Sequence, residues 1–310
     1  MLNHISRGPE ATPWRRWRTR RQVNRAAYGY LFIAPFFVSF GIFGLYPILY
    51  SFYLSLAHWD GFSAPVFVGL TNYQRLLNDS LFYKSITNTL FIWIMSIVPE
   101  LVLALTLALI LNEKWVRGKN AFRAVFYFPN IVTPVTIGVL FSLLFDWQTG
   151  AVNKTLVALH IANHPIDWLG SPLLSQVLVA AVMAWQSFGY NTLLYTAGLQ
   201  SIPDEIVEAA RIDGATSVQV ALRITIPLLR PVVIFTLITS IIGGMQIFGV
   251  PLTLAKTGPD NATLTIVMYL YNTAFKNSDY SYAATIAYGA FVLIAALSVV
   301  TFWLSRARQD

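Results

Sequence analysis

Six long stretches of this sequence are apolar and almost free of charge. Glu100 is the only acidic or basic residue in all of them. A helix needs about 20 mostly apolar residues to cross a lipid bilayer. The sequence therefore predicts an all-α polytopic membrane protein with six transmembrane helices, drawn from Ala26–Ala57, Ser85–Asn112, Ala124–Phe145, Trp168–Pro203, Pro231–Ala255 and Tyr280–Ser305.

The composition excludes the common soluble classes. Hydrophobic residues make up 56% of the chain and charged residues only 11%, with a mean hydropathy of +0.58. Soluble domains carry about 25% charged residues, and disordered chains combine low hydrophobicity with high charge. The chain has no Cys, which excludes disulfides, thiolate metal sites and a cysteine nucleophile.

The uncharged stretches also suggest the domain boundaries. We expect a basic tail over residues 1–27 and one six-helix domain over residues 28–310, with a loop at about 199–230 between spans four and five. The segment Asn261–Phe275 is also uncharged but short and rich in Asn and Thr, so we expect a short surface helix or a re-entrant piece there. The predicted spans are about 29–56, 86–112, 124–146, 173–198, 231–253 and 282–304.

Basic residues are distributed unevenly between the two sides of the predicted spans. Sixteen of the 21 Lys and Arg residues fall on the side of the two termini, and such an excess marks the cytoplasmic side. We therefore expect both termini in the cytoplasm. We attribute the net charge of +7 to the basic residues that set the orientation in the membrane, and not to nucleic-acid binding. Within the tail, Trp14–Arg25 could form an interfacial helix on anionic lipid; ordinary positive-inside charge is the favoured interpretation.

The loop between spans four and five has a regular helical pattern. Ser201–Asp204 fits a capping box with Pro203 in the first turn, so we expect a helix over Ser201–Asp213 that Gly214 ends. Thr216 or Ser217 can cap a second helix, and Pro227 is expected to stop it. The pair Ala209–Ala210 leaves a bare stretch suited to docking against another protein. From the pattern alone, an idle helix on the membrane surface is equally compatible.

The same loop carries a family resemblance. Glu208, Ala209, Ala210, Gly214, Ile224 and Pro227 follow the pattern E-A-A-x3-G-x9-I-x-L-P, with Ile226 in place of the usual Leu. This spacing resembles the EAA signature of the permeases of binding-protein-dependent ABC importers. Further segments are similar to the carbohydrate permeases of the maltose type, and the resemblance runs from about Tyr28 to the C-terminus; these segments are Trp185-Gln186 with Gly189, Ala197–Pro203, Phe122–Phe128 with Pro129 and Pro134, and Thr257–Thr263.

The resemblance implies a permease subunit in a bacterial or archaeal cell (inner) membrane, surrounded by membrane lipid. It implies four protein partners: a second permease subunit in a heterodimer, two ATP-binding subunits and an extracytoplasmic solute-binding protein. The substrate it implies is a carbohydrate, such as an oligosaccharide, disaccharide or glycoside, with glycerol 3-phosphate as an alternative. The surface that couples to the ATP-binding subunit would comprise Glu208, Ala209, Ala210, Gly214, Ile224 and Pro227.

The sequence contains no recognisable nucleotide-binding motif. A phosphate-binding loop needs G-x4-G-K-[ST], and the one Gly-Lys pair, Gly118-Lys119, has Glu113 where the first Gly should stand. We therefore expect no catalytic residues and no cofactor in this chain, and ATP hydrolysis in partner subunits. His160 and His164 are spaced as metal ligands can be, but with only Asp167 as a further candidate ligand we expect solvated histidines and no metal site.

Polar and aromatic residues inside the spans are candidates for the substrate path. Gln186 and Tyr190 are four residues apart and so lie on one helix face. Glu100 is ionisable and deep in a span, which by default indicates function, although a structural hydrogen bond to a neighbouring helix is favoured. For the other residues, helix-to-helix contact is equally compatible. The candidates are Trp185, Gln186, Tyr190, Asn191, Gln246, Phe248 and Glu100.

Two other function classes fit less well. An ion-coupled secondary transporter would usually need more spans, or buried acids to bind the coupling ion, and only Glu100 is available. A membrane-embedded enzyme would need a motif such as H-E-x-x-H or paired carboxylates within the spans, and the sequence has neither.

Overall fold

The computed structural model of the chain describes residues 28–113 and 115–306. The predicted basic tail, residues 1–27 with its segment Trp14–Arg25, lies outside the described residues. The chain divides into two compact units, one ending at Leu54 and the other beginning at Ser55.

In the first unit the described residues form one apolar helix. It covers Tyr28–Ser55 and contains a π-helical turn, η1 (Gly41–Leu45), before α2 (Tyr46–Ser55). None of its most apolar 18-residue window is buried within the chain. A helix that is apolar on all sides is typical of a membrane span.

The second unit is mostly helical. It opens with a two-stranded antiparallel ribbon, β1 (Ala57–His58) and β2 (Val66–Phe67). The helices that follow are α3 (Thr71–Leu77), α4 (Ser80–Asn112), α5 (Lys119–Ile131), α6 (Pro134–Leu144), α7 (Ala151–Ala158), α8 (Pro172–Leu199), α9 (Asp204–Ile212), α10 (Ser217–Val220), η2 (Ala221–Thr225), α11 (Ile226–Leu228), α12 (Arg230–Met245), α13 (Gly249–Leu254), η3 (Pro259–Asn261), α14 (Ile266–Tyr271), η4 (Asn272–Lys276) and α15 (Tyr280–Arg306).

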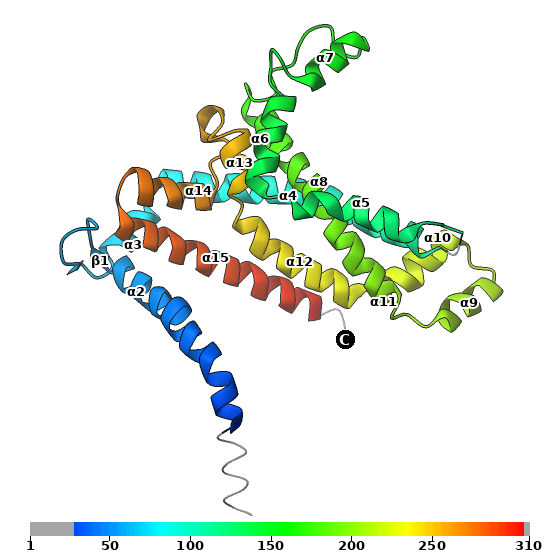
Figure 1. Ribbon diagram of the computed structural model, residues 1–310, viewed down its shortest axis with the longest axis horizontal. Helices are drawn as coiled ribbons and strands as arrows, with labels where there is room; N and C mark the ends of the chain where they lie inside the picture. The colour runs from blue at the N-terminus through cyan, green and yellow to red at the C-terminus, as the bar shows by residue number, and fades with distance from the viewer. Residues whose placement is uncertain (1–27, 114, 307–310) are drawn as a thin grey trace, which may run out of the picture. The chain divides into compact units, whose positions relative to one another are not determined.

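Helix α4 runs through the whole second unit, from α3 at one end to the α9–α10 region at the other (Figure 1). It begins at Ser80, earlier than the predicted residue 86, because Asp79 caps it: Asp79 Oδ1 accepts the backbone N–H groups of Leu81 and Phe82 at 2.9 and 3.3 Å. Pro99 lies inside α4 without ending it. Helix α8 packs along α4, so these two spans form the main pair of the bundle.

Three buried clusters hold the helices together. One joins α4 and α8 at the α9 end, where the small side chains of Ala104 and Ala108 allow the two backbones to approach closely. A central cluster joins α4, α6, α8 and the α13 region around Ile92, Ile137 and Val179. The third lies at the α3 end and contains Leu76, Phe82, Ile266, Tyr282, Ile286 and Ala290.

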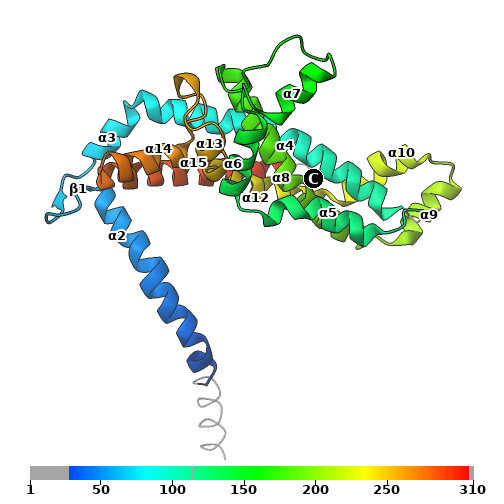
Figure 2. The ribbon, with the colours of Figure 1, turned by 45° about the horizontal axis from the view of Figure 1, so that its top comes forward.

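The segment before and within α14 is tied to α4 by long-range hydrogen bonds. The Asn88 side chain donates to the carbonyls of Asn261 and Leu264 at 2.7 and 3.1 Å, and Thr89 Oγ1 accepts the N–H of Ile266 at 3.0 Å. Helix α14 is short and packs on α15 and α4 (Figure 2). The structure thus has a short helix in Asn261–Phe275, as predicted.

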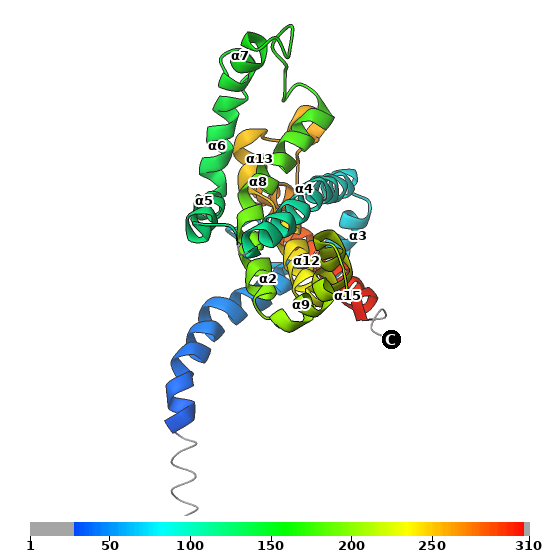
Figure 3. The ribbon, with the colours of Figure 1, turned by 90° about the vertical axis from the view of Figure 1, so that its right-hand side faces the viewer.

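The third predicted span is not one continuous helix. Helices α5 and α6 are bent by 93° at a break between Ile131 and Pro134 (Figure 3). A residue before proline is pushed out of the helical region, and Thr133 accordingly is extended, with ψ of 141°, and caps α6 through its side chain. The predicted span over residues 124–146 is therefore divided here into two helices, which can count together as one bent span.

The fifth predicted span is interrupted as well. Helix α12 ends at Met245 and α13 begins at Gly249. Pro251 has no N–H to donate to the carbonyl of Ile247, four residues earlier, and Thr265 Oγ1 donates to that carbonyl instead, at 2.7 Å. Within the described residues, five helices are long and apolar enough to cross a membrane, or six if α5 and α6 count as one span.

The crossing of α5 and α8 gives a test of the packing. A Cβ on Gly189 would lie 1.8 Å from the carbonyl oxygen of Phe126, whereas a Cβ on Gly243 would have no neighbour within 4 Å. We expect Gly189→Ala to lower the free energy of unfolding by about 1–3 kcal/mol, because the helices must move apart. Thermal unfolding of the purified chain in detergent would measure this change.

The matched control is Gly243→Ala in α12. Because Ala favours the helix over Gly, this variant should be more stable by about 0.5–1 kcal/mol. Equal melting temperatures for the wild type and Gly189→Ala would contradict the close α5–α8 contact.

Candidate functional site

The loop between α8 and α12 forms two helices joined by a turn. The first, α9, begins at Asp204 after Pro203 and has no side-chain cap. The predicted capping box at Ser201 is wrong, because the Ser201 hydroxyl donates to the carbonyl of Gly198 at the end of α8, at 2.7 Å. The carboxylates of Asp204 and Glu205 lie in the first turn, where they interact favourably with the positive end of the helix dipole and so stabilise the start of α9.

Gly214 ends α9 as predicted. Its φ is +84°, a conformation that Gly adopts at little cost. The N–H of Ala215 donates to the carbonyl of Ala210, and the N–H of Gly214 to that of Arg211, at 3.0 and 3.1 Å. These two bonds form a Schellman motif. A Cβ at Gly214 would have no neighbour within 4 Å, so the backbone conformation alone calls for glycine here.

The second helix begins as predicted but ends later. Thr216 caps it in a capping box with Gln219. The prediction that Pro227 stops the helix is wrong, because the chain stays helical through α10, η2 and α11 to Leu228. Proline crowds the carbonyl four residues earlier, here that of Arg223. The wide π-helical turn η2 (Ala221–Thr225) directly before Pro227 relieves this crowding.

The predicted coupling residues lie on the two helices of this loop and in the turn between them. Glu208, Ala209 and Gly214 are exposed, and Ala210 is half-buried. Ile224 is half-buried and Pro227 exposed on the second helix. Helix α9 also exposes 86% of Ile212. An exposed helix with bare alanines and a large apolar side chain is chemically suited to contact another protein.

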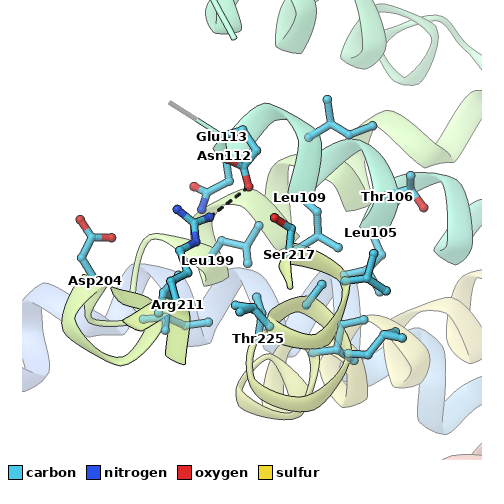
Figure 4. Close-up of a pocket in the computed structure, with 18 of the residues that line it drawn as sticks. Leu105, Thr106, Leu109, Asn112, Glu113, Leu199, Asp204, Arg211, Ser217 and Thr225 are labelled. Atoms are coloured by element: carbon cyan, nitrogen blue, oxygen red, sulfur yellow. Dashed lines mark ion pairs between the residues drawn. The ribbon is translucent and has the colours of Figure 1, made fainter. Parts of the chain in front are cut away.

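A cavity of about 520 Å³ lies behind α9 (Figure 4). Its walls come from the last turns of α4 and α8, from α9, and from the second helix of the loop, and most of them are aliphatic. At its rim Arg211 Nη2 lies 3.6 Å from Glu113 Oε1, beyond the end of α4. The two side chains are 49% and 40% exposed, and such a surface ion pair contributes about 0–1 kcal/mol. This ion pair therefore fixes α9 only weakly against α4.

The structure separates the predicted path residues of α8 into two groups. Trp185 and Tyr190 are 40% and 42% exposed, whereas Gln186 and Asn191 are buried. Gln186 Nε2 donates to the carbonyl of Val132 at the break between α5 and α6, at 3.1 Å. Asn191 Nδ2 donates to Glu100 Oε1 of α4. Gln186 and Asn191 therefore connect α8 to neighbouring helices.

The two remaining path candidates lie at the break between α12 and α13. Gln246 is exposed and follows the last residue of α12. The ring of Phe248 packs on Tyr271 of α14, with 5.2 Å between centroids. His160 and His164 lie in the loop after α7, and no group of three or more His, Asp and Glu side chains suited to a metal exists within the described ranges.

Sequence reasoning missed a polar cluster at the α3 end. Asp79 Oδ2 accepts hydrogen bonds from the hydroxyls of Tyr269 in α14 and Tyr282 in α15. Arg75 lies 3.7 Å from the centre of the Tyr282 ring and pairs with Asp279 at 2.7 Å. The cluster joins α3, α4, α14 and α15. The sequence allows Asp79 to be recognised as a helix cap. Its tyrosine partners lie 190 and 203 residues later in the chain, so no local pattern connects them to Asp79.

Asp79 is held in its ionised form. Burial alone would raise the pKa of this carboxyl, but the hydrogen bonds from Tyr269, Tyr282 and the N-terminal amides of α4 lower the pKa below its ordinary value.

Known proteins resemble this chain over most of its length. The family model described as binding-protein-dependent transport system inner membrane component matches residues 89–308. The lactose transport system permease protein LacF of Rhizobium radiobacter is 38% identical, with 91% of this chain and 95% of LacF covered. The arabinooligosaccharides transport system permease protein AraP of Bacillus subtilis (strain 168) is 34% identical, with 96% and 94% covered.

A solved structure shares the fold. The crystal structure of a bacterial ABC transporter involved in the import of the acidic polysaccharide alginate contains a chain that matches with a TM-score of 0.81 at 23% identity. The match covers 94% of this chain and 100% of that chain.

The polar cluster predicts a pH dependence. Because the pKa of Asp79 is lowered in the folded chain, its ionised form stabilises the fold above the ordinary pKa, and this stabilisation is lost as the pH falls. We expect the melting temperature of the wild type to drop more steeply between about pH 5 and pH 3 than that of Asp79→Asn. Thermal melts across this pH range would measure the difference.

Asp260→Asn is the matched control, because Asp260 is exposed and Asn tolerates its positive φ of 52°. The control should follow the wild-type curve. Parallel curves for the wild type and Asp79→Asn would refute the contribution of the cluster.

Proposed function

Since this chain belongs to the family of binding-protein-dependent transport system inner membrane components, we propose that it carries a carbohydrate into the cytoplasm as a permease subunit of an ATP-driven importer. The relatives named above are called permeases for lactose and for arabinooligosaccharides. These names support a sugar as the substrate of this chain, and more narrowly an oligosaccharide or a glycoside. Family membership argues against the alternative of an ion-coupled secondary transporter.

The observation that carries the proposal is the exposed helix α9. It presents Glu208, Ala209 and Ala210 at the spacing of the EAA motif before Gly214. Its N-terminal end follows α8 after a short segment, and its C-terminal end leads through the second helix of the loop into α12; α8 and α12 are both in candidate spans. A partner that moves α9 would therefore act directly on two spans.

The mechanism we propose is alternating access. Closure of two ATP-binding subunits carries α9 with it, and α8 and α12 follow because they are joined to it. The weak Arg211–Glu113 ion pair allows α9 to shift against α4. Hydrolysis then reverses the movement. Because the sequence has no phosphate-binding glycine loop, we place ATP binding in the partner subunits.

The proposed assembly contains a second permease subunit in a heterodimer, two ATP-binding subunits and an extracytoplasmic solute-binding protein. The excess of basic residues on the side of the termini supports a cytoplasmic location for both ends and for α9. The α3 end of the second unit then faces outward.

For the sugar path we favour the candidates with exposed surface, which are Trp185, Tyr190, Gln246 and the neighbouring Phe248. Aromatic faces and amide groups suit the apolar and polar sides of a sugar ring. Gln186, Asn191 and Glu100 are assigned to helix contacts instead, because their side chains already have partners on other helices or at the α5–α6 break.

The coupling role of α9 is tested by Ala209→Asp. An added carboxylate would be buried without a partner in the docked surface, and the cost of several kcal/mol should uncouple ATP hydrolysis from transport. We expect stimulation of ATPase activity by sugar-loaded binding protein to fall at least about tenfold in the reconstituted importer. The ATPase rate with and without loaded binding protein is the measurement.

Ala209→Ser is the matched control, since it is small and uncharged, and it should keep the stimulation. An Ala209→Asp importer that assembles and responds fully would rule out α9 as the coupling element.

The proposed orientation is tested with reporter fusions. Fusions at Gly118 and Gly214 should report the cytoplasm, because they lie in the loops richest in basic residues. Fusions at Gly61, Gly150 and Gly258 should report the outside. A cytoplasmic signal at Gly150 would contradict the assignment of α5 and α6 to one span.

A further inference from the structure

Five aromatic rings follow one another in contact along the second unit. The centroid distances are 5.6 Å from Trp59 to Tyr280, 6.4 Å from Tyr280 to Phe275, 5.1 Å from Phe275 to Tyr271, and 5.2 Å from Tyr271 to Phe248. We call this series the aromatic track. It begins in the loop between β1 and β2 and ends at the break between α12 and α13.

The middle of the track is an uncovered surface. Tyr271 and Phe275 are four residues apart and so share a face of α14 and η4. They are 36% and 65% exposed, whereas Ile266 and Met268 on the other side of α14 are buried. The chain therefore packs one face of this helix and leaves the aromatic face open.

The outer end of the track is held firmly in place. Trp59 Nε1 donates to the carbonyl of Ser63 at 2.7 Å, and Asp60 Oδ1 accepts from Phe62 N, Ser63 N and Ser63 Oγ. These bonds lower the pKa of Asp60 to about 2. Gly61 lies so close to the Tyr280 ring that a Cβ would be 2.7 Å from it. The loop thus fixes Trp59 against Tyr280.

Polar groups accompany the rings. Within the described part of the chain, the hydroxyls of Tyr271 and Tyr280 make no hydrogen bond, and neither residue is buried. The exposed amide of Gln246 lies two residues before Phe248, at the inner end. Flat apolar faces with donors and acceptors at their edges match a carbohydrate, which has both apolar ring faces and hydroxyls.

We propose that the aromatic track is a sugar-binding surface that guides the carbohydrate from the outer face to the break between α12 and α13. This inference rests on the proposed function. Tyr and Trp at a membrane interface would gather at one depth. The track instead extends through four successive ring contacts, with centroid distances of 5.1–6.4 Å, from the loop between β1 and β2 to Phe248. It also ends at Phe248, two residues after Gln246, and we assign both residues to the sugar path.

Access of water to the track is the first test. The chain has no Cys, so Phe275→Cys introduces a single thiol. Phe291→Cys is the matched control, because Phe291 on α15 is 64% exposed against 65% for Phe275. In the complete importer in vesicles, a membrane-impermeant maleimide added outside should label position 275 at least about tenfold faster than position 291, since only a hydrated path admits the reagent.

Transport is the second test. Calorimetry of the cognate binding protein with lactose, maltose, trehalose and arabinotriose selects the sugar, and its uptake is measured for Phe275→Leu, Phe275→Tyr and Phe291→Leu. Loss of one ring contact should lower uptake by Phe275→Leu about three- to tenfold. Phe275→Tyr and Phe291→Leu should stay near the wild-type rate, and ATPase stimulation should persist in all three.

The results distinguish failure of the aromatic track from failure of the proposed function. Wild-type uptake of the sugar together with unchanged uptake by Phe275→Leu would overturn the track alone, as would equal labelling at positions 275 and 291. Loss of assembly in Phe275→Leu would also overturn it, because the face would then bind the second permease subunit. A wild-type importer that takes up none of the four sugars would overturn the proposed function, and the track with it.

Discussion

The arrangement of the spans depends on hydrogen bonds that satisfy backbone groups where helices break. A carbonyl without a donor costs several kcal/mol in an apolar membrane. In a continuous helix the N–H of Thr136 would donate to the carbonyl of Val132. Here that N–H donates to Thr133 Oγ1 instead, and the carbonyl of Val132 accepts a hydrogen bond from Gln186 of α8. The carbonyl of Ile247 is satisfied by Thr265. Each break is thus closed by a side chain from a distant segment, which also fixes where the neighbouring helices lie.

The two ends of the second unit are held with different strength. At the α3 end, Asp79 joins three helices through a cap and two tyrosine hydroxyls. At the α9 end, a cavity of about 520 Å³ separates α9 from the spans, and the weak Arg211–Glu113 ion pair links α9 to the end of α4. A firmly held α3 end and a weakly held α9 end suit a protein in which a conformational change begins at α9.

Local signals were sufficient for much of this fold. The lengths of the apolar stretches predicted the all-α membrane fold, and Gly214 and Thr216 predicted the turn and cap of the loop. Proline did not predict where a helix breaks, because α4 continues through Pro99 whereas the break between α5 and α6 lies directly before Pro134. Only the neighbouring helices decide between these outcomes. The partners of Asp79 and Gln186 depended on contacts between distant segments, which periodicity does not encode.

The hydrogen bonds of Asn88 impose an order on assembly. Its acceptors are carbonyls 173 and 176 residues later in the chain. Synthesis proceeds at about 5–20 residues per second, so the amide waits on the order of ten seconds for them. During that time the Asn88 amide group lacks its native acceptors. The half of α4 nearest α3 therefore reaches its final environment only after residues 261–264 have been made, so the packing of this early helix against the segment before α14 is a late step of biogenesis.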